Sequence, residues 1–513
     1  MAKTAHPGIT RRRFLNTAAS MMAVAGVGRP YLSRASDRPL MTHGIQSGDV
    51  SADSAVIWAR SDRAARFMVE VSPTDSFTDI LGMVHADARP ESDFTAKLLL
   101  ENLPAGQELF YRARFEDLSF SSLLGEAQVG RFRTAPADRR SLSFVWSGDC
   151  AGQGWGIDES RGGMRTFATM LRNKPDFFIH CGDSIYADDS MRPEQTLPDG
   201  SIWRNIVTEE KSHSAHTLAD FRGCHKYNLL DANVRAFYAN VPLFAMWDDH
   251  EVTNDWIPAD PLATGKAEIR MLQLAANGRR AFNEYKPLRP KPLDKARIYR
   301  KVAYGPMLDM FLLDMRSYRN ATDIILGAEQ VAWLKRELEN STATWKVIAA
   351  DMPLGVINTD GPAFGDGAPQ GRESEIADLL SFIKHAGVRN AVWITADQHY
   401  TAAHYYDPNK AVFQDFEPFW EFMSGPIHAG TWTPSGMDNT FGPQRLFHKA
   451  CSAEQGDNLA PCFGLQFFGH VEIDGESEVM TVTLKDVEDN NLWFKAIEPD
   501  RKKLSRNIIP ARS

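Results

Sequence analysis

Side chains that can bind cations follow several apolar stretches of this chain. In HCGDSIYADD, residues 180–189, an apolar run leads directly into Asp183, Tyr186 and two further carboxylates. The same order recurs at four other places, where the polar residues are Asp149 and Cys150, then Asp248, Asp249, His250 and Glu251, then Asp351, and finally Asp397 and His399. Buried carboxylates without a partner are costly or take up a proton. Such clusters on one edge of a fold therefore predict bound metal ions, which would neutralise the negative charge.

Each of these residues also has a purely structural explanation when it is taken alone. Asp149 could cap a helix, Tyr186 could be a core tyrosine, and His399 could be a buried core histidine. The repetition favours the functional interpretation, because perturbed acids concentrated in one cleft are typical of active sites. A phosphatase with Ser147 or Ser184 as its nucleophile is a rival interpretation, but neither serine lies in a GxSxG turn.

The apolar runs alternate with helical patterns from residue 141 onward. The predicted strands are SLSFVWS, PDFFIHC, PLFAMW, TWKVIAA and RNAVWIT. Leu334 and Leu338 precede one strand at helical spacing, and Ile376 and Leu380 precede another. These βα units predict a largely parallel or mixed sheet covered by helices, with ligands at the carboxyl ends of its strands. The stretch LQFFGHVEIDGESEVMTVTLKD predicts a closing β-hairpin.

Residues 40–135 alternate between apolar and polar side chains without helical periodicity, which predicts a separate strand-rich domain. Tyr111, in LPAGQELFYRARF, is similar to the corner tyrosine of an immunoglobulin or fibronectin-III sandwich, whose hydroxyl bonds to loop backbone. A packing module is favoured over a domain for substrate access or carbohydrate binding, because a fold alone does not specify a function.

The first 35 residues predict an export signal. Three arginines, residues 11–13, precede a short apolar stretch, residues 18–27, and small residues follow up to Ala35. This order is typical of a cleaved signal peptide, and the paired arginines resemble the twin-arginine signal. A basic surface helix is the alternative. We therefore expect export through the twin-arginine translocase to the periplasm or the cell exterior, with no stable membrane anchor after cleavage.

Charge and cysteine content narrow the remaining classes. A net charge of −9 argues against a nucleic-acid partner, because proteins that bind nucleic acids usually have a basic face. Five cysteines leave at least one thiol outside any disulfide. Cys451 and Cys462 lie close together in a loop-rich stretch, where they could form a disulfide or remain free.

The strand-end motifs resemble those of a known enzyme family. GDSIY, DDHE and DQH are similar to the GDxxY, GNHE and GxH motifs of the calcineurin-like metallophosphoesterases. More narrowly, GDC at 148–150, GDSIYADD at 182–189, WDDHEVTNDW at 247–256 and ADQHY at 396–400 resemble the PhoD-like alkaline phosphatase D family.

The resemblance implies a fold and a domain order. The fold would be α/β, with a metallophosphoesterase-type β-sandwich core flanked by helices at 140–490. An all-β immunoglobulin- or fibronectin-III-like domain at 40–135 would precede it. A twin-arginine signal peptide would occupy residues 1–35, and residues 491–513 would form a C-terminal tail.

The resemblance also implies a role for each matching residue. The implied metal ligands are Cys150, Asp183, Tyr186, Asp249, Asp397 and His399. Asp183 would bridge two metal ions, while Tyr186 as a phenolate and Cys150 as a thiolate would bind iron. His250 and Asp183 would be the catalytic residues, with His250 donating a hydrogen bond or proton to the phosphate. Further metal ligands, or acceptors behind the ligands, would be Asp149, Asp248, Glu251 and Asn254.

The implied cofactors are iron (Fe3+) and calcium, since the carboxylate excess suits calcium better than zinc, with another divalent metal as the alternative. The implied activity is that of an exported alkaline phosphatase or phosphodiesterase, which hydrolyses small-molecule or lipid phosphate esters with a metal-activated hydroxide. The alternatives are a phospholipase D-like phosphodiesterase of the same family and a non-enzymatic exported binding protein with a vestigial metal site. Two residues depart from the family pattern: Asp149 could add a calcium ligand or an acceptor, and Ser184 could widen the cleft.

Overall fold

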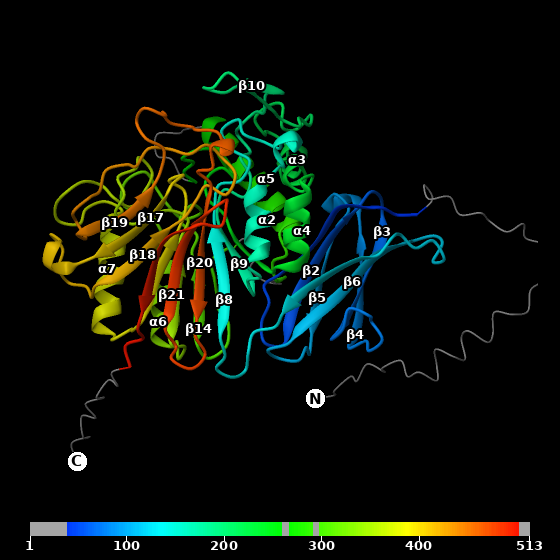
Figure 1. Cartoon of the computed structure of the whole chain (residues 1–513), viewed down its shortest axis with the longest axis horizontal. Helices are drawn as coiled ribbons and strands as arrows, with labels where there is room; N and C mark the ends of the chain where they lie inside the picture. The colour runs from blue at the N-terminus through cyan, green and yellow to red at the C-terminus, as the bar shows by residue number, and fades with distance from the viewer. Residues whose placement is uncertain (1–37, 259–265, 291–296, 502–513) are drawn as a thin grey trace, which may run out of the picture. The chain divides into compact units, whose positions relative to one another are not determined.

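Two β-sheets that face each other form the centre of the computed structural model, which describes residues 38–258, 266–290 and 297–501, with backbone alone for 266–269 (Figure 1). The expected signal peptide, residues 1–35, lies outside the described residues. In the first sheet the strand order is β22-β21-β20-β8-β9-β12, continued by β1, β2 and β5. In the second sheet it is β13-β14-β15-β16-β18-β17-β19.

The central strands of both sheets run parallel. In the first sheet β8 (Leu142–Ser147), β9 (Phe177–Cys181) and β12 (Leu243–Met246) are parallel neighbours. In the second sheet β14 (Leu308–Leu312), β15 (Trp345–Ala349), β16 (Ala391–Thr395) and β18 (Phe419–Met423) are parallel neighbours. Antiparallel strands complete the edges: β13 (Arg300–Ala303), β17 (Thr401–Tyr406), β19 (Pro443–Lys449), β20 (Phe467–Ile473), β21 (Met480–Asp486) and β22 (Asn491–Ile497). The predicted mixed sheet is therefore confirmed as two sheets, and the closing hairpin is β20 paired with β21.

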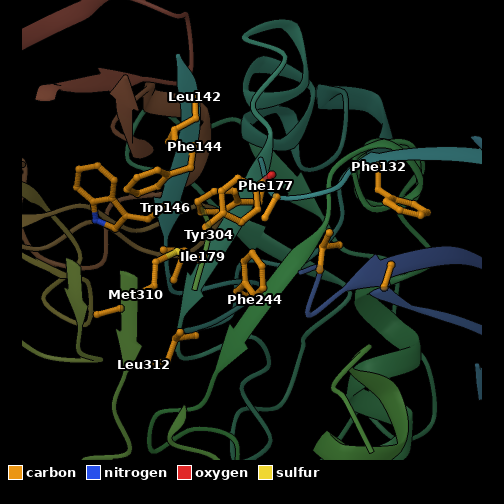
Figure 2. Packing of buried hydrophobic residues seen from close by; sticks show 14 of the residues in the cluster. Phe132, Leu142, Phe144, Trp146, Phe177, Ile179, Phe244, Tyr304, Met310 and Leu312 are labelled. Atoms are coloured by element: carbon orange, nitrogen blue, oxygen red, sulfur yellow. The ribbon is translucent and has the colours of Figure 1, made fainter. Parts of the chain in front are cut away.

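Apolar side chains fill the space between the two sheets. Phe144 and Trp146 of β8 and Phe177 of β9 belong to one buried cluster with Met310 and Leu312 of β14 (Figure 2). The rings of Phe144 and Phe177 stack with centroids 4.9 Å apart. Val145, which lies between Phe144 and Trp146, joins a different cluster beneath the helices. Because successive strand residues point to opposite faces, strands buried on both faces are apolar throughout.

Helices cover the outer face of each sheet. α2 (Arg165–Arg172), α3 (Leu218–Asn228), α4 (Ala232–Asn240) and α5 (Lys266–Tyr285) lie on the side of the first sheet, where Phe167 and Phe237 pack on Phe178. α6 (Ala328–Glu339) and α7 (Glu373–His385) lie on the side of the second sheet, in one cluster with Ile348 and Trp393. The helix-flanked β-sandwich core is thus confirmed. Within the described ranges, no helix has both the length and the apolar character that a membrane crossing requires.

The N-terminal strands form a second, smaller sandwich. β1 (Met41–Gly48), β2 (Ser54–Ser61) and β5 (Thr95–Glu101) form one layer, and β3 (Ala65–Ser72), β4 (Gly82–Ala88), β6 (Glu108–Asp117) and β7 (Gln128–Arg133) form the other. The alternating burial of β3 and β6 matches their alternating sequence.

Two expectations about the domain edges need correction. The Tyr111 hydroxyl donates to the Ala239 carbonyl in α4 (3.1 Å), so it ties the small sandwich to a helix beside the first large sheet instead of bracing a loop of its own domain. Residues 491–497 form β22 and pair with β21, so the chain leaves the sheet after residue 497. Trp493 of β22 packs against the central cluster, which explains why this segment stays in the sheet.

The cysteines, which all lie in the described ranges, carry no disulfide. All five are free, and Cys451 Sγ lies 3.5 Å from the Thr431 carbonyl oxygen. Of the two alternatives for Cys451 and Cys462, the structure shows the free thiols.

Candidate metal centre

The carboxyl ends of the central strands of both sheets meet at one edge, and the polar residues follow directly. Asp149 follows β8, Asp183 follows β9, and Asp397 and His399 follow β16. All four have left-handed backbone conformations, with φ of +66°, +51°, +71° and +57° respectively. Such conformations are uncommon outside glycine and cluster at functional sites. They turn the chain sharply at the sheet edge, so that the side chains converge.

Gly182 allows two of these turns to approach each other. Its φ is +105°, and a Cβ at this position would lie 2.4 Å from the Asp248 Cβ. A side chain there would push apart the turns after β9 and β12. The glycine of the GDSIY motif therefore serves close packing at the centre.

Three overlapping groups of side chains have ligand atoms within 4.8 Å of one another: Asp149, Asp183 and His399; Asp183, Asp249 and His250; Asp249, Asp255 and Asp360. Asp183 belongs to the first two groups, and Asp249 belongs to the last two. The groups therefore form one continuous row, joined through Asp183 and Asp249.

The first group has the donors that a metal ion requires. Both carboxylate oxygens of Asp149 are buried without a hydrogen-bond partner. His399 Nδ1 lies 2.6 Å from the Gly430 carbonyl, which can only accept, so Nε2 presents its lone pair on the side of Tyr186. The Tyr186 hydroxyl lies 2.7 Å from that Nε2. This set of carboxylates, imidazole and phenol fits a cation.

Repulsion among the buried carboxylates also indicates a cation at this position. Burial, followed by the carboxylates of Asp248 and Asp249, raises the pKa of Asp183 well above its usual value. Burial and Asp248 do the same to the pKa of Asp149. The ionised forms of both side chains therefore need positive charge close by.

His250 is held by a carboxylate to which the family motifs assign no role. Its Nδ1 lies 2.7 Å from Asp188 Oδ1, which leaves Nε2 for the cluster. The Asn254 backbone amide donates to Asp188 Oδ2 at 2.7 Å. Burial alone would lower the pKa of His250, but Asp249 and Asp188 outweigh it and raise that pKa to about 10. The imidazolium is therefore favoured next to this row of acids.

Glu251 and Asp248 lie behind the row and shape it. Glu251 accepts hydrogen bonds from the backbone amides of Asp183, Ser184 and Asp248, and from the Ser184 hydroxyl. Asp248 Oδ1 pairs with Arg316 Nε at 2.5 Å. Neither carboxylate belongs to the three groups. Glu251 instead holds the backbone of the turns, and Asp248 pairs with Arg316.

Cys150 does not join the predicted ligand set. Its Sγ lies 3.7 Å from Met164 Sδ, in an apolar cluster beneath the helices that also contains Phe167. Burial raises the pKa of this thiol, which opposes a thiolate. Asp149, its neighbour, supplies the buried carboxylate instead. The expectation of a cysteine ligand is corrected, because the sharp left-handed turn at Asp149 (φ +66°) turns this carboxylate to the row while Cys150 packs in the apolar cluster.

Separate substitutions of Cys150 and Asp149 distinguish the roles of these two residues in metal binding. Cys150→Ser is expected to keep its full metal content, whereas Asp149→Asn should lose metal affinity by more than about tenfold, because the first group then lacks a charged ligand. Asparagine tolerates the left-handed backbone at this position. Metal per protein after dialysis, measured by mass spectrometry, checks the pair. If Cys150→Ser lost metal while Asp149→Asn retained it, the thiolate of Cys150 would be a metal ligand after all.

Asp397 and Asp351 reach the same region without joining a group. Asp397 Oδ1 lies 3.7 Å from Arg316 Nη2, and its Oδ2 accepts from Asn358 Nδ2 at 3.4 Å. Asp351 Oδ2 lies 3.2 Å from Arg316 Nε. Asp397, although predicted as a ligand, therefore lines the cavity and contacts Arg316 and Asn358.

Sequence reasoning missed Arg316, Asp360, Asp255 and Asp188. Arg316 is fully buried and contacts Asp248, Asp351 and Asp360. It follows β14 in FLLDMR, so the strand-end rule could have found it. Asp188 lies within the GDSIYADD motif itself. Asp255 lies within the WDDHEVTNDW motif, and Asp360 comes from a loop that no pattern marked.

The two serines of the rival mechanism are occupied elsewhere. The Ser147 hydroxyl donates to the Phe467 carbonyl at 2.8 Å, and the Ser184 hydroxyl donates to Glu251 Oε1 at 2.7 Å. Both serines are buried. Neither serine lines the cavity that opens onto the row of acids, so the serine mechanism has no support.

An open cavity of about 360 Å³ gives access to the row. Its lining includes four residues of this region, Asp183, Asp249, His250 and His399, and also Trp432 and Asp457. A small molecule with a phosphate group fits a cavity of this size.

Comparisons with known proteins agree with this geometry. A model of the PhoD-like phosphatase family matches residues 144–484, and a model of the N-terminal domain of PhoD-like phosphatases matches residues 26–136. Alkaline phosphatase D of Bacillus subtilis (strain 168) is 27% identical over 433 residues, which cover 77% of this chain and 69% of that protein.

Solved structures show the same fold. A structure of PhoD aligns with a TM-score of 0.67 and 21% identity, over 90% of this chain and 92% of that chain. Purple acid phosphatase PPD1 from yellow lupin (Lupinus luteus) seeds aligns with a TM-score of 0.54 and 12% identity, over 90% of this chain and 75% of that chain.

Proposed function

This chain belongs to the PhoD-like phosphatase family and is a phosphoester hydrolase, and we propose that it is an exported enzyme whose activity depends on metal ions held by the row of acids at the sheet edge. The observation that carries the metal dependence is the fully buried carboxylate of Asp149. Neither of its oxygens has a hydrogen-bond partner, and both Asp183 and His399 lie close to it. The substrate is a small-molecule phosphate ester, and lipid esters are a proposed extension.

We assign the first group, Asp149, Asp183 and His399, together with Tyr186, to iron. Burial and the Asp183 carboxylate raise the pKa of Tyr186 well above its usual value, so a phenolate requires a strongly Lewis-acidic cation. The row beyond Asp183 contains mainly carboxylate oxygens, which suit calcium. When bound, such cations supply charge stabilisation to the phosphoryl oxygens and lower the pKa of water.

His250 is the residue that donates a proton in the proposed reaction. Its Nδ1 is paired with Asp188, so Nε2 is the nitrogen that can donate a proton at the cavity. Proton donation to the departing alcohol oxygen is a general-acid role, which suits a histidine that is held in its protonated form. Asp188 positions the ring and stabilises the imidazolium.

Export rests on the arginine cluster at residues 11–13 and the short apolar stretch that follows. We propose that the twin-arginine translocase carries the protein out of the cytoplasm. Of the functional alternatives, a phospholipase D-like activity would use the same acid row on a lipid diester.

Metal removal tests the proposed function. Chelation of the purified protein is expected to lower kcat for 4-nitrophenyl phosphate or its diester by more than about 100-fold, because even groups that only orient a metal ligand are worth roughly 10- to 100-fold. Restoring iron and calcium should restore the rate and a visible tyrosinate-to-iron absorption band. Circular dichroism before and after chelation controls for unfolding. Full activity in a folded protein free of metal would refute the proposal.

A further inference from the structure

Trp432 interrupts the polar lining of the cavity. Among the described residues that line this cavity, it is the one large apolar side chain, and 38% of it is exposed. Its backbone is hydrogen-bonded to a candidate metal ligand, because the Trp432 backbone amide donates to the His399 carbonyl at 3.1 Å. The preceding turn is fastened as well, because His399 Nδ1 donates to the Gly430 carbonyl at 2.6 Å. The indole therefore belongs to the same rigid unit as a candidate metal ligand.

The indole is also held at its polar edge. Trp432 Nε1 donates to Gln153 Oε1 at 3.2 Å, and Gln153 lines the cavity too. The backbone of Gln153 is held in turn. Its backbone N–H donates to Asp189 Oδ2 at 2.5 Å, and its backbone carbonyl accepts from Asn458 Nδ2 at 3.2 Å. A tryptophan whose N–H is satisfied and whose loop is anchored loses little entropy when a ligand contacts it.

A carboxylate stands on the same wall. The amide and hydroxyl of Thr433 donate to Asp457 Oδ1 at 2.9 and 2.8 Å, and both residues line the cavity. Negative charge here disfavours a ligand with a second anionic group. The wall thus combines an apolar face with an acid.

We infer that Trp432 is the specificity-determining residue for the alcohol part of the ester, and that this part is a planar aromatic group without a further negative charge. The inference rests on the proposed function, which places the phosphoryl group at the row from Asp149 to Asp249. The alcohol then extends along the cavity to the indole. Stacking on an indole rewards a flat ring over a small aliphatic group.

Two unreactive phosphonates test this without a difference in leaving groups. Inhibition constants of phenylphosphonate and methylphosphonate are measured on the metal-loaded full protein. In Trp432→Ala, the preference for phenylphosphonate should fall by roughly tenfold, while methylphosphonate inhibits within about twofold of the original value. Trp432→Phe should keep most of the preference. Trp432→Leu, which fills the space without a ring, should lose it, and this variant remains informative if the alanine variant does not fold.

Phe463 provides the matched control, because it has the same 38% exposure and does not line this cavity. Phe463→Ala should leave both inhibition constants unchanged. A preference that survives in Trp432→Ala and Trp432→Leu, or equal weakening of both phosphonates, would overturn the inference while ester hydrolysis by the original protein stands. If the metal-loaded original protein neither hydrolyses esters nor binds either phosphonate, the proposed function itself fails.

Discussion

Asp183→Asn is expected to lower kcat for aryl phosphate esters by more than about 100-fold and to reduce bound metal, since even residues that only orient a ligand are typically worth roughly 10- to 100-fold. Asp183 is shared by two of the three ligand groups, so its loss disturbs both. An amide has the shape of a carboxylate but no charge, and its nitrogen is not a metal ligand. It cannot serve two cations with two anionic oxygens.

The fold should survive this change. Asp183 has a φ of +51°, a conformation that asparagine tolerates well. Asp489→Asn is the matched control, because Asp489 has a φ of +73° on the β21–β22 hairpin, away from the ligand groups. Steady-state rates and metal content of the two variants decide the matter. A wild-type rate in Asp183→Asn would remove Asp183 from the mechanism.

Arg316→Met is expected to lower the free energy of unfolding of the metal-free protein by about 3–5 kcal/mol, the range for breaking a buried ion pair. The guanidinium is fully buried, and its nitrogens contact the carboxylates of Asp248, Asp351 and Asp360. Methionine fills most of the volume but leaves Asp248 and Asp351 without their cation, while Asp360 keeps Arg319 at 3.4 Å. The loss is therefore electrostatic and not a cavity effect.

The pH dependence gives this prediction a second readout. Burial raises the pKa of Asp248 to about 7 even though Arg316 lowers it, so removal of Arg316 raises that pKa further. A carboxyl group whose pKa is higher in the folded state binds more protons there, and stability then falls as pH rises. The deficit of Arg316→Met should be larger at about pH 8 than at about pH 5.

Urea unfolding at both pH values measures the effect. Arg204→Met is the control, since Arg204 is an exposed arginine paired with Glu194 at 3.3 Å, and a surface pair of this kind is worth less than about 1 kcal/mol. A deficit in Arg316→Met no larger than that of Arg204→Met would mean that the buried acids do not depend on this guanidinium.

Much of the site could be predicted because the signal is local. Each apolar strand of a parallel sheet ends at the same edge, so the positions of Asp183, His250 and His399 after such strands were enough to predict that they meet. The alternation of β3 and β6 likewise predicted a sandwich of its own. These features depend on spacing along the chain.

Other features depend on contacts that spacing does not encode. The pairing of Asp188 with His250 links a turn after β9 to a turn after β12. The Tyr111 hydroxyl bonds to α4, so a tyrosine that resembled a loop brace became a contact between two parts of the chain.

The amino-acid sequence by itself determined the family, the edge of the sheet where the acids gather, and the need for positive charge among them, because all three follow from local patterns of apolar and charged residues. Only the tertiary structure decided that Asp149 and not Cys150 faces the row, since the left-handed turn at Asp149 sets where the two side chains lie and no local sequence pattern reveals that turn. It also decided that Arg316 is the cation behind the row, because burial among several carboxylates depends on how the two sheets pack.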